Sequence, residues 1–71
     1  MYVMVTLGDG LGNNLGTNFV LSANIGIVTP SVATKSELLA GKVVSVENTA
    51  TRITVTSLGT CTNSLNITIA S

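Results

Sequence analysis

The chain has 71 residues, only 8% of them charged, and its three basic and three acidic side chains give no net charge. Ordinary domains carry roughly 25% charged residues, and this chain has neither the basic stripe that binds nucleic acid nor the polybasic segment that binds an anionic membrane. One cysteine and no histidine exclude an internal disulfide and a zinc site, so we expect a single β domain, residues 1–71, without metal or cofactor.

The N-terminal segment Tyr2–Leu7 predicts a first strand, because its residues alternate between two faces. Both faces are largely apolar, which indicates contacts on two sides. The segment has no basic n-region and no long apolar region, so no signal peptide is predicted and we expect synthesis in the cytoplasm. No run of the chain approaches the roughly 20 apolar residues of a membrane-spanning helix.

Leu7–Asn18, with the sequence LGDGLGNNLGTN, is rich in glycine and asparagine. A dinucleotide-binding Gly-x-Gly-x-x-Gly motif fails because Asn13 stands in the place of the third glycine, and the Gly-Lys-Ser/Thr ending of a P-loop is absent. A calcium loop would need several carboxylates, and Asp9 is the only one here. We therefore expect a wide turn or arch whose leucines pack into the core or against a neighbour.

Asn18–Ala23 predicts a second strand, with the single phenylalanine, Phe19, as a core anchor. The residues expected on its inward face are Phe19, Leu21 and Ala23. The strand is expected to continue past a bulge at Gly26 and to end at Pro30, because proline cannot donate to a sheet.

The segment TKSELLAG carries the one helical signal and predicts a helix of one to two turns near Thr34–Ala40, covering an open end of the sheet. Thr34 and Glu37 have the spacing of a capping box, and Gly41 is placed to end the helix. The residues predicted to face inward are Leu38 and Leu39.

Lys42–Ser57 predicts a β-hairpin, because apolar and polar residues alternate on both arms and a short polar loop, Asn48–Thr51, joins them. The alternation favours a register in which like residues face one another. The predicted pairs are Glu47 with Arg52, Val46 with Ile53, Ser45 with Thr54 and Val44 with Val55. We interpret the first of these as a solvated ion pair without a catalytic role.

Leu58–Ser64 predicts a turn or loop that contains Cys61. This cysteine has no histidine or basic neighbour in sequence to activate it, so we expect an inert, buried thiol, reduced when the protein is made. Leu65–Ala70 predicts the last strand. Because the glycosylation triplet that begins at Asn66 lies within this strand, we interpret it as accidental.

Together these elements predict an all-β fold, a small antiparallel sandwich or partly open barrel of about five strands with one short helix. A chain of this length buries only about 60% of its unfolded surface, so without a disulfide or metal it gains stability from partners. The mean hydropathy is +0.60, and the predicted edges mostly lack the lysine or proline that prevents pairing between chains. We therefore expect a homo-oligomer.

The run Ala33–Ile69 resembles small β-rich modules of phage virion proteins, namely tail-fibre, tail-associated and capsid-decorating pieces. The recurrent parts are the helix-like SELLAG, the alternating segment with its Asn-Thr-Ala-Thr loop, and the TSLGTCTNS turn. The resemblance covers about half of the chain. It implies a virion component that contacts copies of itself and capsid or tail protein, with no catalytic residue to carry over.

The leading functional hypothesis is a structural assembly protein of a virion, packing as a symmetric oligomer or lattice. The alternatives are a glycan- or host-surface-binding module, for which Tyr2 and Phe19 are the available aromatic residues, and a homopolymeric fibre subunit. We do not expect an enzyme, because the chain has no histidine and its carboxylates are scattered at Asp9, Glu37 and Glu47.

Overall fold

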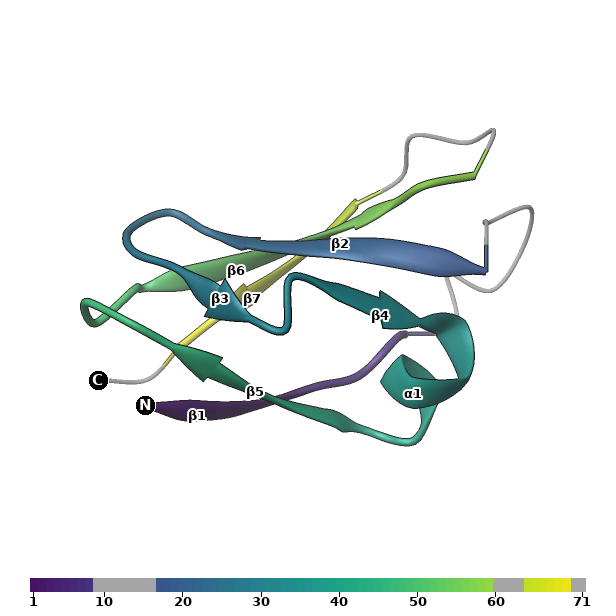
Figure 1. Ribbon diagram of the computed structural model, residues 1–71, viewed down its shortest axis with the longest axis horizontal. Coiled ribbons are helices and arrows are strands. Elements are labelled where there is room, and N and C mark those ends of the chain that lie inside the picture. The colour runs from purple at the N-terminus through teal and green to yellow at the C-terminus, as the bar shows by residue number, and fades with distance from the viewer. Residues whose placement is uncertain (9–16, 60–63, 70–71) are drawn as a thin grey trace.

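The computed structural model describes residues 1–8, 17–59 and 64–69. These residues form two antiparallel sheets, one with the strand order β1-β5-β3 and one with the order β4-β2-β6-β7, together with one short helix (Figure 1). In chain order the elements are β1 (Tyr2–Val5), β2 (Asn18–Ala23), β3 (Val28–Thr29), β4 (Val32–Thr34), α1 (Lys35–Leu39), β5 (Lys42–Val46), β6 (Arg52–Ser57) and β7 (Ser64–Thr68). The predicted antiparallel all-β sandwich with one short helix is confirmed, although the described residues form more than the expected five strands.

The segment after β2 does not continue that strand, so the predicted bulge at Gly26 is wrong. The chain turns at Gly26, which has φ +82, and β3 then pairs with β5 in the other sheet. The positive φ suits glycine, which has no Cβ to clash with the backbone. The prediction that the chain breaks at Pro30 is confirmed, because the short strands β3 and β4 lie on either side of it.

The hairpin predicted for Lys42–Ser57 is also wrong, because β5 and β6 belong to different sheets. β5 lies between β1 and β3, whereas β6 lies between β2 and β7. The chain between them crosses from one sheet to the other as a β-arch, seen at the left of Figure 1. None of the predicted cross-strand pairs forms, namely Glu47–Arg52, Val46–Ile53, Ser45–Thr54 and Val44–Val55.

The turn of the arch lies at Asn48 and Thr49, whose φ values are 58 and 50. Ala50 follows them and is buried. An arch places the apolar faces of its two strands opposite each other across the core, whereas a hairpin places them side by side on one sheet. Both arrangements give the same alternation along the chain, so the pattern did not distinguish them.

The core lies between the two sheets and consists of alternate residues from both. The predicted inward residues of β2 are confirmed, with Ala23 partly buried at the end of its strand, and the apolar faces of β5 and β6 also lie in the core. The largest fully buried side chains are Phe19, Leu38, Ile53, Val5, Val44 and Val55. The half-buried Leu65, Ile67 and Ile69 pack against this core from the side of β7.

Helix α1 begins after the N-cap Thr34 and lies at one end of the two sheets (Figure 1). The predicted capping box is present, and Gly41 follows the C-cap with φ +87. Leu38 is buried as expected. Leu39 is 58% exposed, which corrects its prediction, because a helix of five residues turns only a narrow stripe toward the core.

The outer strands differ slightly from their predicted bounds, since β1 ends at Val5 and β7 runs from Ser64 to Thr68. Most of the predicted arch at Leu7–Asn18, including Asp9, and the predicted thiol at Cys61 lie outside the described residues. Within the described ranges, no helix is long and apolar enough to cross a bilayer.

Candidate assembly surface

The outer face of the β1-β5-β3 sheet carries exposed apolar side chains on neighbouring strands. Met4 of β1 lies opposite Val43 of β5, and Tyr2 lies opposite Ser45. Tyr2 is 80% exposed, Met4 65% and Val43 54%. Because these residues occupy adjacent register positions on one face, they form a continuous apolar surface, which we call the Tyr2–Met4–Val43 patch.

Gly41 lies directly beneath the Met4 side chain of this patch. A Cβ atom at Gly41 would lie 3.2 Å from the Met4 sulfur and 3.6 Å from the Thr6 methyl carbon. Met4 therefore lies over the glycine that ends α1. The same residue provides both the positive φ of the helix C-terminus and the space for the methionine side chain.

Charged residues lie at the ends of β5 and leave the middle of the patch uncharged. Lys42 is the first residue of β5, and Glu47 directly follows the last. Ile27 adds a further exposed apolar side chain beside Glu47, whose N–H donates to the Ile27 carbonyl at 3.0 Å. An exposed apolar surface bordered by polar groups is typical of a protein–protein contact.

The outer face of the β4-β2-β6-β7 sheet is chemically different. Ser22, Thr54 and Asn66 form one row across β2, β6 and β7, and the Thr54 hydroxyl donates to the Asn66 side-chain carbonyl at 2.9 Å. This face is mostly hydroxyl and amide. The sequence pattern does not distinguish these two outer faces, because the distinction depends on which strands share a sheet.

The four edge strands differ in how well they are protected from pairing. β3 and β4 have two and three residues and flank Pro30, which makes them poor templates for another strand. β1 and β7 have four and five residues, with no charge and no proline. Val3 of β1 and Leu65 and Ile67 of β7 face inward but are only half-buried, whereas Val5 of β1 is fully buried.

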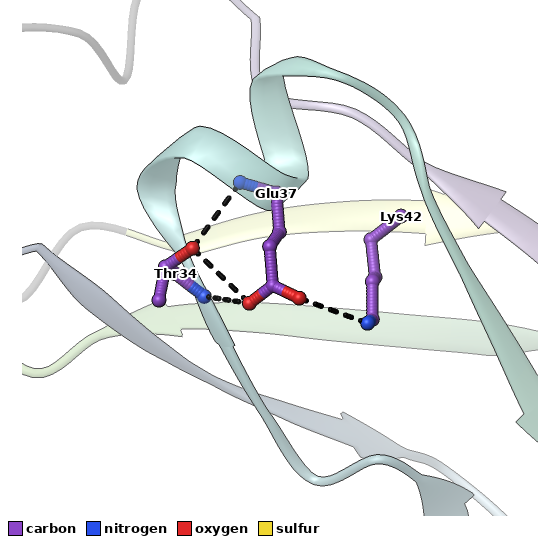
Figure 2. A network of polar contacts seen from close by, with 3 residues as sticks. All are labelled: Thr34, Glu37 and Lys42. Atoms are coloured by element: carbon purple, nitrogen blue, oxygen red, sulfur yellow. Dashed lines mark hydrogen bonds and ion pairs between the residues drawn. The ribbon is translucent and has the colours of Figure 1, made fainter.

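The cap of α1 forms a polar network on the surface, shown in Figure 2. The Thr34 N–H donates to one Glu37 carboxylate oxygen at 3.0 Å, and Lys42 Nζ forms an ion pair with the other at 2.9 Å. The Thr34 N–H, then Lys42, then the Thr34 hydroxyl lower the pKa of Glu37 from 4.5 to about 2. Each contact also serves to cap the helix or to tie it to β5, so we assign the network a structural role.

Little else in the described ranges suggests chemistry. They contain no pocket and no group of three or more potential metal-binding side chains. Phe19 is buried in the core, so it contributes no exposed ring, whereas Tyr2 does. The surface can therefore contribute apolar contacts and open strand edges. Comparisons of the chain with protein-family models, with curated proteins and with solved structures find no match.

Proposed function

We propose that this protein is a structural assembly module, a small phage virion component that packs with copies of itself and with capsid or tail protein into a symmetric oligomer or lattice. The observation that carries the proposal is the Tyr2–Met4–Val43 patch, which leaves three large apolar side chains more than half exposed on one sheet face. Burial of such surface favours association, because it removes apolar side chains from water.

The low charge of the chain supports the same function. With 8% charged residues and no net charge, neighbouring copies experience little repulsion. The virion assignment is supported by the resemblance of Ala33–Ile69 to phage modules. It predicts that neighbouring genes encode capsid or tail proteins and that the chain is present in purified particles.

Light scattering coupled to size-exclusion chromatography tests the assembly. At micromolar concentration we expect the wild-type chain to exceed its monomer mass of 7.2 kDa. Val43→Lys places a charge in the patch and should weaken association at least about tenfold. Val32→Lys is the matched control, because Val32 is 50% exposed on an edge of the other sheet, and it should leave association unchanged.

A wild-type chain that stays monomeric and folded at these concentrations would contradict the proposal. The fibre-subunit alternative predicts filaments of the purified protein alone in electron microscopy. The glycan-binding alternative depends on Tyr2, the exposed aromatic side chain. It predicts binding on a glycan array that is lost in Tyr2→Ala.

A further inference from the structure

Among the described residues no strand pairs with the outer side of β7, and the hydrogen bonds to β6 show which of its backbone groups point to that side. The Ile69 N–H donates to the Thr51 carbonyl at 3.0 Å, so Ile69 belongs to a hydrogen-bonded pair of the β6–β7 ladder. Hydrogen-bonded pairs alternate with non-bonded pairs along an antiparallel ladder. The backbone groups of Leu65 and Ile67 therefore point toward β6, and those of Ser64, Asn66 and Thr68 point away from the sheet.

The sequence of β7, Ser-Leu-Asn-Ile-Thr, matches its own reversed copy. When a second copy of β7 runs antiparallel to the first with its Asn66 opposite the first Asn66, Leu65 of one copy lies opposite Ile67 of the other, and Ser64 lies opposite Thr68. In this pairing, apolar side chains of the two copies face each other on the inner side of the sheet. Side chains with hydroxyl or amide groups face each other on the outer side. The strand carries no charge, so two copies meet without repulsion.

We propose that a second copy of this chain adds antiparallel to β7, with Asn66 facing Asn66 of the second copy across a two-fold axis. The outward N–H and C=O groups of Ser64, Asn66 and Thr68 then form hydrogen-bonded pairs with Thr68, Asn66 and Ser64 of the second copy. The two four-stranded sheets become one continuous sheet. This inference rests on the proposed assembly function and names the partner and the edge that it uses.

The flank on which β7 lies also has apolar surface to cover. β3 contacts β2 on the opposite flank, so β1, the other long edge strand, lies on the same flank as β7. Val3 of β1 is half-buried there, as are Leu65 and Ile67 of β7. A second copy at this flank covers these side chains. The opposite flank offers only the short edges β3 and β4.

A pair of charge variants tests the two-fold contact. Asn66→Glu places two carboxylates opposite each other at the axis, and it should weaken dimerisation at least about tenfold in sedimentation equilibrium. Ser22→Glu adds the same charge on the same face and row, but on β2 instead of the edge, so it should dimerise like wild type. Equal urea midpoints for the two variants establish that both are folded.

Charge reversal gives a positive result that general destabilisation cannot produce. Asn66→Lys alone should also weaken dimerisation, and an equimolar mixture of Asn66→Glu and Asn66→Lys should restore it. Hydrogen exchange of wild type gives a readout without mutation. The Asn66 amide should be protected at high concentration and exchange freely on dilution, whereas the Leu65 amide, bonded within the monomer, should be protected in both.

The outcomes separate this inference from the proposed function. If wild type associates and Asn66→Glu behaves like Ser22→Glu, the β7 contact is wrong while the assembly function stands. An Asn66 amide that exchanges equally fast at high and low concentration contradicts the contact in the same way. A wild-type chain that is monomeric throughout contradicts both.

Discussion

Gly26 packs directly against the backbone of Glu47, and a Cβ atom at Gly26 would collide with the Glu47 carbonyl oxygen. One residue further on, the Glu47 N–H donates to the Ile27 carbonyl at 3.0 Å. The turn after β2 and the arch between β5 and β6 are therefore in contact at one end of the sandwich. The Ile27–Glu47 hydrogen bond extends the pairing of β3 with β5, and each of the two turns leads from one sheet to the other.

Gly26→Ala is expected to destabilise the fold by about 2–4 kcal/mol, because it combines a positive φ with a backbone collision that no side-chain movement relieves. Urea unfolding followed by circular dichroism measures the change. Gly8→Ala is the matched control, since within the described part of the chain no atom beyond its sequence neighbours lies within 4 Å of the added methyl group. Equal unfolding free energies for the two variants would show that the two turns do not pack as described.

The Asn24 side chain connects the turn after β2 to the end of the arch between β5 and β6. Its Oδ1 accepts hydrogen bonds from the Thr51 and Arg52 N–H groups, both at 3.0 Å, and its Nδ2 donates to the Thr51 hydroxyl at 2.7 Å. Asn24→Ala should cost about 1–3 kcal/mol of unfolding free energy in urea titrations. Asn18→Ala, which removes an exposed asparagine side chain at the start of β2, should cost less than half as much.

Val43 and Val44 separate association from folding, because they are adjacent in sequence and face opposite sides of β5. Val44 is buried in the core and Val43 is exposed in the patch. Val44→Ala should lower the unfolding free energy by about 2 kcal/mol. Val43→Ala should leave it within about 0.5 kcal/mol under monomeric conditions and weaken association. The reverse pattern would contradict the burial of Val44 and the exposure of Val43.

The Glu37 carboxylate should make the stability of the protein depend on pH in acid. Its pKa falls from 4.5 to about 2 on folding, so below about pH 4.5 the unfolded chain takes up a proton that the folded chain does not. This contribution to stability is complete above pH 4.5 and is lost as the pH falls toward 2. The melting temperature of Glu37→Gln should decrease less steeply over this range than that of wild type.

Glu47→Gln is the matched control for the loss of a carboxylate, because Glu47 is exposed and lies outside the network of Thr34, Glu37 and Lys42. We expect it to retain the wild-type dependence of melting temperature on pH. If the melting temperatures of Glu37→Gln and Glu47→Gln depend on pH with the same slope, the capping contacts of the Glu37 carboxylate do not form in the protein in solution.

The sequence alone determined the short helix with its cap, the approximate places of the five longer strands, and the side of β2 that faces the core. The Thr34–Glu37 spacing located the helix and its cap, and the alternation about Phe19 located β2 and its inward face, because both signals depend on neighbouring residues only. The alternation in Lys42–Ser57 likewise predicted that the apolar residues of each arm share one face, and in the structure Val44 and Ile53 of these faces lie in the core.

Only the tertiary structure decided which strands pair. β5 and β6 have the alternation of a hairpin, yet each pairs with strands remote in sequence, and the side-chain pattern is the same whether two apolar faces lie side by side or across a core. The patch of Tyr2, Met4 and Val43 follows from that choice. It exists because β1 joins β5, at a sequence separation that local patterns do not encode.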